Sequence, residues 1–312
     1  MQIAPDAWSQ HRSSLRDALI WLAWCSLAWW PVLALATPAA QTLTVRYSPG
    51  GTAPAYALKV LKLALDKSGQ PYRLVAITGA MTTPRIISDI RSNRRDGVNV
   101  FWAASHDALE QALWAVPIPI ERGLIGYRLL AIRQASGDRL SRITTMAELK
   151  TLTLLQGLGW SDVALLRHHG MHVIEAAPEQ LYKMLAAGRA DAFPRSVLDA
   201  DRELRAQQPT RPPLAIARHL ALLYPRFGVF FFVSRDNPAL HAALENGLNS
   251  AIRDGSFSRL YEHDPDIRAA LKRLQEPRQV FILPPAPGSS RLLQLPPALF
   301  DARLSAARHR AP

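Results

Sequence analysis

The chain has 312 residues, 48% of them hydrophobic, and a formal net charge of +12 at pH 7. This length and apolar fraction allow one large or two ordinary globular domains and exclude an intrinsically disordered chain. The positive charge suits an anionic partner or a solvated basic surface. No long Lys/Arg run, zinc spacing or RNA-binding aromatic motif is present, so no nucleic-acid partner is predicted. The sole cysteine, Cys25, cannot form a disulfide within the chain, and no cofactor or metal is expected.

The N-terminal stretch reads as a targeting segment. Residues 18–36 are almost all apolar, follow a polar start that contains two arginines, and end in the small-x-small pattern of residues 34–36. This pattern predicts that residues 1–40 are a signal peptide. An uncleaved membrane anchor is the alternative, because roughly 19 apolar residues just span a bilayer. On either interpretation the rest of the chain is exported.

The first folded part alternates predicted strands and helices, which is typical of a parallel sheet with helical crossovers. Glycine or proline punctuates each transition. The expected strands are residues 42–48, 72–78 and 98–102, and the expected helices are residues 55–67 and 84–94.

A second alternation of the same kind occupies the middle of the chain. Gly157 and Gly159 allow a tight turn after the first of its strands, and Ser161 and Asp162 are good helix N-caps. The expected strands are residues 151–156, 172–176 and 191–194, and the expected helices are residues 161–169 and 178–187. The chain is therefore predicted to hold two α/β lobes, each with a mixed, mostly parallel sheet flanked by helices.

The remaining segments are less regular. Residues 114–132 are expected to be extended because two prolines exclude a helix, and residues 209–213 form a loop. The uninterrupted apolar run at residues 229–233 predicts a strand buried on both faces. Helices are expected at residues 145–150, 197–207, 237–254, 256–262 and 264–275. The Pro- and Arg-rich end, from residue 284, either packs over the first lobe or trails into solvent.

Three runs of sequence resemble a known family. LLQGLGWSDVALLRHHG (residues 154–170), followed by YKMLAAGRADAFPRS, resembles the second lobe of type II periplasmic solute-binding proteins of the family 3, amino-acid type. IPIERGLIGYRLLAI (residues 118–132) is similar to the crossing into that lobe, and FGVFFFVSRDNPALHAALENGLNSAIRDGSFSRLY (residues 227–261) to the return. The resemblance covers roughly residues 42–285.

The resemblance implies a two-lobed periplasmic-binding-protein-like II fold. Its expected parts are the signal peptide 1–40, lobe 1 at 41–131 and 225–285, lobe 2 at 132–224, and a C-terminal tail at 286–312. It implies a monomeric, non-enzymatic periplasmic protein that closes around a small polar solute and serves an ABC-type permease or a sensor. An enzyme on the same fold, such as a dehydratase, and a signalling or interaction module without transport are the alternatives.

The same resemblance suggests where a solute would bind. Gly157, Trp160, Ser161 and Asp162 lie in a strand-to-helix loop whose free N–H groups suit an anion. A plain helix cap is the alternative. Arg195 follows the next strand but one and is expected to help hold an acidic or polar solute.

Three further residues complete the expected site. Tyr47 and Trp102 end strands of the first lobe, where the family uses aromatic rings to stack on the solute; core packing is the alternative. Arg122 could bind an anion bidentately or form a surface salt bridge. The family's carboxylate-binding arginine is missing after Trp102, and no aspartate lies beside Arg195, so a standard amino-acid ligand is in doubt. The adjacent pair of histidines at 168 and 169 does not share a helix face, so no metal site is predicted.

Overall fold

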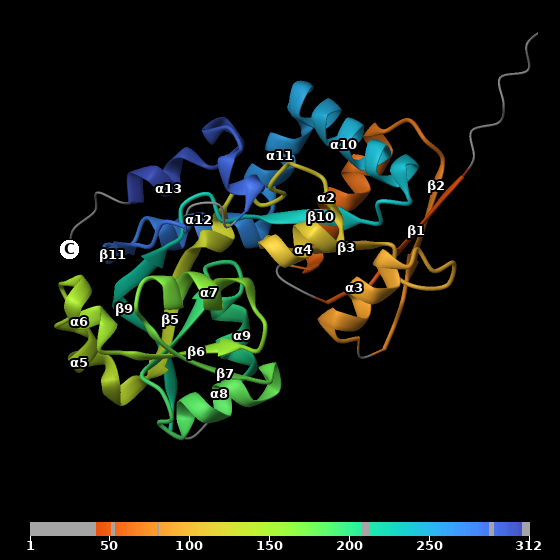
Figure 1. Ribbon diagram of the computed structural model, residues 1–312. Helices are drawn as coiled ribbons and strands as arrows, with labels where there is room; N and C mark the ends of the chain where they lie inside the picture. The colour runs from red at the N-terminus through yellow and green to blue at the C-terminus, as the bar shows by residue number, and fades with distance from the viewer. Residues whose placement is uncertain (1–41, 51–53, 80, 208–211, 287–289, 308–312) are drawn as a thin grey trace, which may run out of the picture. The chain divides into compact units, whose positions relative to one another are not determined.

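The computed structural model describes residues 42–50, 54–79, 81–207, 212–286 and 290–307. The predicted signal peptide lies outside these ranges. None of the helices within them has both the length and the apolar character needed to cross a bilayer. Figure 1 shows the described elements with the labels used below.

The first sheet has five strands in the order β2-β1-β3-β10-β4. Strands β1, β2 and β3 are mutually parallel, and β10 runs antiparallel to β3 and β4. Its strands are β1 (Leu43–Tyr47), β2 (Tyr72–Ala76), β3 (Val100–Ala104), β4 (Trp114–Ala115) and β10 (Val229–Val233). The helices associated with it are α2 (Pro54–Lys67), α3 (Thr83–Arg91), α4 (Asp107–Ala112), α10 (Pro238–Arg253) and α11 (Ser256–His263).

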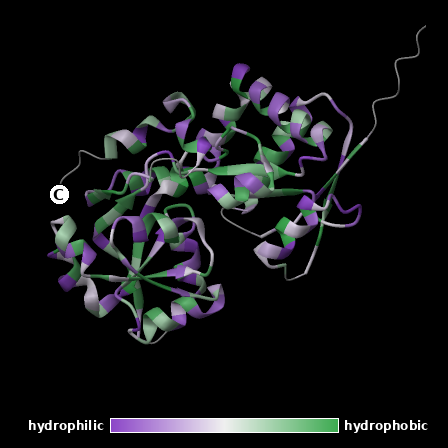
Figure 2. Cartoon of the chain, viewed as in Figure 1, coloured by the Kyte–Doolittle hydropathy of each residue, from purple (hydrophilic) through white to green (hydrophobic). Residues whose placement is uncertain are grey.

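Strand β10 is buried on both faces, as its apolar sequence predicts. Phe231 belongs to the core that also contains residues of α2 and α10, whereas Phe230 and Phe232 pack with residues of α3 and α4. Successive side chains of a strand point to opposite faces, so five consecutive apolar residues supply both layers. Figure 2 shows the resulting hydrophobic strands between helices with hydrophilic outer faces.

The second sheet has six strands in the order β11-β9-β5-β8-β6-β7. Strands β6, β7 and β8 are parallel, β5 is antiparallel to β8 and β9, and β11 is parallel to β9. Its strands are β5 (Tyr127–Arg133), β6 (Thr153–Gly157), β7 (His172–Ala176), β8 (Ala192–Ser196), β9 (Leu214–Leu223) and β11 (Gln279–Ile282). The helices that follow the same part of the chain are α5 (Gly137–Ser141), α6 (Met146–Lys150), α7 (Ser161–His168), α8 (Pro178–Ala186) and α9 (Ala200–Ala206).

Two strands of this sheet were not predicted. In β9 the apolar pattern is interrupted by Arg218 and His219, and its pairing with β5 contains an irregularity in register. Strand β11 has only four residues and lies inside the range expected for lobe 1, yet it pairs with β9 of the second sheet. The lobe boundaries remain a prediction, but the range 225–285 contributes a strand to each sheet.

The chain passes between the two sheets after β4 and again after β9. Glu121 joins these two crossings, because its carboxylate accepts hydrogen bonds from the backbone N–H groups of Gly123 and Val229, both at 2.6 Å. The first crossing ends in the 3₁₀ turn Leu124–Gly126. A third passage runs through helix α12 (Pro265–Leu274) into β11.

The C-terminal segment packs against the first sheet and the first crossing, one of the two arrangements expected from its sequence. It contains the 3₁₀ turns Arg291–Gln294 and Pro297–Leu299 and helix α13 (Ala302–Ala306). Leu292 joins the core beneath Phe230, and Ser290 donates to the buried carboxylate of Glu110. Asp301 donates its N–H to the Arg122 carbonyl at 2.8 Å and accepts the Tyr261 hydroxyl at 2.7 Å.

Candidate functional site

A cavity of about 490 Å³ lies between residues of the two sheets. The first sheet contributes the end of β3 and the start of α4, including Trp102 and His106. The second sheet contributes the start of α7, one side of α8, strand β8 and helix α9. The cavity thus opens at the carboxyl ends of the parallel strands β3 and β6, where ligands of open α/β sheets bind.

The loop between β6 and α7 forms one wall, as the sequence suggests. A Cβ at Gly157 would lie 2.1 Å from the Trp160 ring, so this glycine leaves the space that the indole occupies. Gly159 has φ +73°, a conformation that side-chain-bearing residues rarely adopt. Helix α7 starts at Ser161, with Trp160 in the cap position, and Trp160, Ser161 and Asp162 all line the cavity.

Arg195 is a buried residue of the cavity lining beside this loop, but its charge already has a partner. Its Nε and one terminal nitrogen each donate to Glu203 at 2.6 Å, a bidentate pair. Tyr182 donates its hydroxyl to the same carboxylate at 3.0 Å. Burial alone would raise the pKa of Glu203, but the hydrogen bonds and charge of Arg195 outweigh burial and lower it. The expected role of Arg195 as a contact for an acidic solute therefore has a competitor within the protein.

The Arg195 guanidinium also lies over two aromatic rings. Its central carbon is 4.6 Å from the centroid of the Trp160 ring and 4.9 Å from that of Phe193. The two rings stack at 6.2 Å, and Tyr182 meets Phe193 edge-on. Aromatic faces attract a cation, so they hold the guanidinium in the orientation that faces Glu203.

Arg128 is a cavity residue that was not predicted from the sequence. It is the second residue of the buried strand β5, and its guanidinium is 3.3 Å from the Asp162 carboxylate. Gln156 donates to the same carboxylate at 2.9 Å, and the guanidinium lies over the rings of Tyr224 and Phe227. The Nε of Arg128 has no hydrogen-bond partner. The available signal was a lone arginine within the apolar run LIGYRLLAI, since a charge in such a strand needs a specific partner.

Trp102 is both a core residue and a cavity residue. Core packing and a position in the cavity wall, given as alternatives from the sequence, both apply to it. It is 2% exposed, meets Phe231 edge-on at 6.4 Å, and lines the cavity. Its indole Nε1 has no hydrogen-bond partner. Tyr47 lies behind it, with ring centroids 6.1 Å apart, and is not among the cavity-lining residues.

Two other residues named from the sequence lie away from the cavity wall. Arg122 is in the first crossing with φ +54°, and its guanidinium lies over the Tyr261 ring at 5.3 Å. Gly157 is beneath Trp160 rather than in the lining. Their expected solute contacts therefore stay a prediction without geometric support.

The histidines make no metal site in the described ranges. No group of three or more His, Cys, Asp or Glu side chains there is arranged to hold a metal ion. His169 contacts the Pro284 carbonyl through Nε2 at 2.7 Å. His106 lines the cavity, and burial lowers its pKa more than the carboxylates of Glu110 and Asp107 raise it, so its imidazole is neutral at pH 7.

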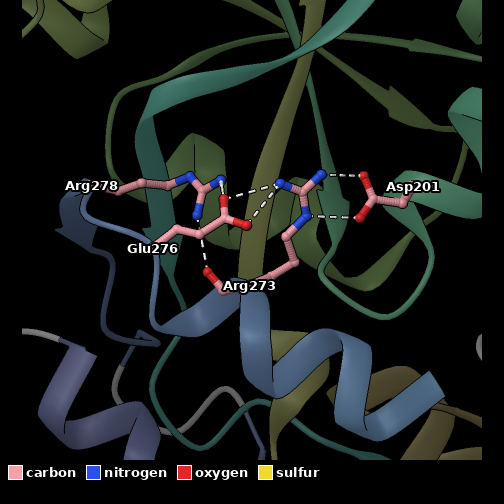
Figure 3. A network of polar contacts seen from close by, with 4 residues as sticks. All are labelled: Asp201, Arg273, Glu276 and Arg278. Atoms are coloured by element: carbon pink, nitrogen blue, oxygen red, sulfur yellow. Dashed lines mark hydrogen bonds and ion pairs between the residues drawn. The ribbon is translucent and has the colours of Figure 1, made fainter. Parts of the chain in front are cut away.

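An ionic network outside the cavity anchors helix α9, which carries Glu203. Arg273, at the end of α12, donates to Asp201 of α9 at 2.8 and 2.6 Å (Figure 3). It also pairs with Glu276, which accepts from the almost fully buried Arg278 at 2.5 Å. The network ties α9 to the segment that leads into β11, and so it fixes the helix that supplies one wall of the cavity.

No protein-family model and no curated protein matches the sequence. Solved structures do match the fold. The Bordetella pertussis BvgS periplasmic VFT2 domain has 20% sequence identity and a TM-score of 0.51, over 70% of this chain and 93% of that chain. An ancestral arginine-binding protein bound to arginine has 14% identity and a TM-score of 0.51, over 72% of this chain and 98% of that chain.

A third matching structure is an ancestral amino-acid-binding protein described as a precursor of cyclohexadienyl dehydratase. It has 14% identity and a TM-score of 0.50, over 71% of this chain and 94% of that chain. The two mixed sheets and the crossings that connect them agree with these structural similarities. The chain has the two-lobed type II periplasmic solute-binding-protein fold. At these identities the comparisons establish the fold alone, so any inference about a ligand depends on the side chains of the cavity.

Within the type II fold, the side chains of this cavity depart from the amino-acid-binding pattern expected from the resemblance. Strand β3 is followed by Ser105 and His106 rather than by an arginine, and β8 ends in Pro194, Arg195 and Ser196 rather than in an aspartate. The charged cavity residues belong to β5, α7, β8 and α9, with Asp199 directly before α9. The fold is shared, but the charged groups of the cavity are arranged differently from that pattern.

Proposed function

We propose that the chain is an exported solute-binding protein that closes its two lobes around a small polar solute. The cavity between residues of the two sheets is the observation that carries this proposal. Its volume of about 490 Å³ is within the roughly 300–1,000 Å³ typical of small-molecule sites. Trp102, Trp160 and Tyr182 supply the large apolar surface, and polar side chains such as His106 and Ser161 line the same cavity.

The two-sheet construction supplies a mechanism. Few segments connect the sheets, so small backbone changes in the crossings can bring the walls together. A solute that contacts both Trp102 and Trp160 makes its full set of contacts only in the closed form, and binding therefore favours closure. Delivery of the solute to an ABC-type permease or to a sensor follows from the same conformational change. The apolar N-terminal segment supports export to the periplasm.

A thermal-shift screen tests the proposal. Purified protein is heated with amino acids, dicarboxylates, polyamines and sugar acids, and a solute at 100 times its Kd should add about 2.7 kcal/mol to the free energy of unfolding. Trp160→Ala should abolish the shift caused by any hit, since the indole forms part of the cavity wall. Arg167→Ala, an exposed residue of the same helix, is the matched control and should keep it.

Three outcomes would redirect the proposal. A hit that is converted to a product would favour an enzyme on the same fold, a possibility also raised by the dehydratase precursor among the similar structures. A shift that survives Trp160→Ala unchanged would place the solute elsewhere. The absence of any shift across the panel would favour an interaction module that does not bind a solute.

A further inference from the structure

We propose that the cavity selects solutes without net charge, and that Glu203 determines this specificity by cancelling the charge of Arg195. The inference rests on the proposed solute-binding function and names the substrate class of the same site. It narrows the acidic or polar solute expected from the sequence, in which Arg195 appears without its partner, to a polar solute without net charge.

The first observation is that every arginine of the cavity wall faces a carboxylate. Arg128 lies 3.3 Å from Asp162, and Arg202 lies 2.5 Å from Asp199. Both of these carboxylates are almost fully buried. Solvent does little to screen the Arg128 pair, whose two side chains are buried, whereas the exposed side chain of Arg202 leaves its pair partly screened. Together with Arg195 and Glu203, they make three positive and three negative side chains in the wall, which therefore carries no net charge.

The second observation is the geometry of Arg195 and Glu203. Both oxygens of Glu203 accept from Arg195 at 2.6 Å, and one also accepts from Tyr182. The pair therefore takes up both oxygens of Glu203 and two of the five N–H donors of Arg195 within the protein. The guanidinium also lies over the Trp160 and Phe193 rings, so a turn towards an incoming anion would cost it these contacts as well as its bonds to Glu203.

The third observation concerns what the wall offers instead. The Nε1 of Trp102 and the Nε of Arg128 are buried donors without a hydrogen-bond partner. Both belong to residues that line the cavity, and a carbonyl, hydroxyl or amide oxygen is the kind of partner that each donor lacks. A net charge would lose its hydration without finding an unpaired opposite charge, and this loss makes binding unfavourable. The cavity therefore suits polar solutes that are neutral or zwitterionic.

Glu203→Gln provides the test, because it keeps the shape of the side chain and releases the charge of Arg195. Succinate is the probe, and binding is followed by thermal shift and calorimetry. Succinate should bind Glu203→Gln at least about tenfold more tightly than it binds the wild type, the change expected of a charge-assisted hydrogen bond. Glu262→Gln is the matched control, since Glu262 also pairs bidentately with an arginine, Arg303, but outside the cavity. Succinate should bind Glu262→Gln no more tightly than it binds the wild type.

The reciprocal variant covers the case in which Glu203→Gln does not fold. Arg195→Gln leaves Glu203 as the unpaired charge, so putrescine, a dication, should bind this variant and not the wild type. Saturable binding of succinate to the wild type would overturn the inference. It would also be overturned if Glu203→Gln did not gain succinate binding and Arg195→Gln did not gain putrescine binding. A gain of succinate binding by Glu203→Gln, with no neutral solute bound by the wild type, would uphold the charge inference while counting against the proposed function.

Discussion

At the residue scale, Glu121 is the most unusual ionisable group outside the cavity. It is 1% exposed, and burial raises its pKa to about 7, although two backbone N–H groups and Arg128 favour its charged form. The residue lies where the two crossings between the sheets meet, since its bonds reach Gly123 and Val229. Its protonation is therefore coupled to the segments that connect the lobes.

The raised pKa predicts a specific pH dependence of stability. The native state holds the Glu121 proton more tightly than the unfolded state, in which the pKa is near 4.5. Protonated Glu121 therefore stabilises the native state fully below about pH 4.5. This contribution to the free energy of unfolding is lost as the pH rises through about 7, a change of ~3 kcal/mol. The measurement is the free energy of unfolding between pH 5 and pH 8, compared with Glu121→Gln, whose side chain does not titrate. The free energy of unfolding of the wild type, relative to that of Glu121→Gln, should fall as the pH rises from 5 to 8.

The exposed Glu262 is the control for that comparison, because Glu262→Gln removes a carboxyl group that is partly solvated. Its pH profile should run parallel to that of the wild type. A gap between wild type and Glu121→Gln that stays constant from pH 5 to pH 8 would contradict the raised pKa.

At the element scale, helices α2 and α10 approach each other closely through Gly247. A Cβ at this position would lie 1.8 Å from the backbone oxygen of Ala64 in α2. Backbone cannot yield as a flexible side chain does, so the helices would have to separate. The glycine in α10 is thus required by the packing of the two helices against the first sheet.

Gly247→Ala should lower the free energy of unfolding by about 3 kcal/mol or more, the upper part of the range for overpacking. Gly137→Ala is the matched control. Gly137 starts helix α5 with φ −55°, and a Cβ added there would meet no atom within 4 Å, so alanine should be neutral or slightly stabilising. Chemical denaturation measures both, and equal effects of the two substitutions would show that α2 and α10 do not pack in this way.

At the scale of the whole molecule, the segment after residue 285 completes the core. Leu292, Phe300 and Leu304 of this segment are buried. Phe300 and Leu304 pack against Gly123 in the first crossing, and Asp301 bonds to the Arg122 carbonyl in the same crossing. The segment therefore stabilises both the first sheet and the connection to the second.

Deletion of residues 286–312 should lower the free energy of unfolding by about 5 kcal/mol, since burial of each large apolar side chain contributes about 1.5–3 kcal/mol. Thermal and chemical denaturation measure the loss. Arg291→Ala, an exposed side chain of the same segment, should leave stability near the wild-type value. A deletion variant as stable as the full chain would show that the segment only rests on the surface.

The sequence alone predicted the two α/β alternations and the doubly buried strand β10, because periodicity, glycine stops and proline starts are local signals. It also placed Trp102, Trp160, Ser161, Asp162 and Arg195 in one site through a family resemblance, and these five residues do line one cavity. Strands β9 and β11 escaped prediction. One is interrupted by polar residues and the other is short, and both form only because a neighbouring strand accepts their hydrogen bonds.

The tertiary structure decided the electrostatics of the site. Arg195 and Glu203 are eight residues apart on different elements, and Arg128 meets Asp162 from a strand 34 positions earlier in the chain. No periodic pattern records such pairs, because the energy of a buried charge depends on which groups the fold brings within a few ångströms of it. Composition and local pattern determined that this chain makes two sheets with a helix-lined site. Only the packing of α9 against β8 decided that the arginine of that site is already neutralised.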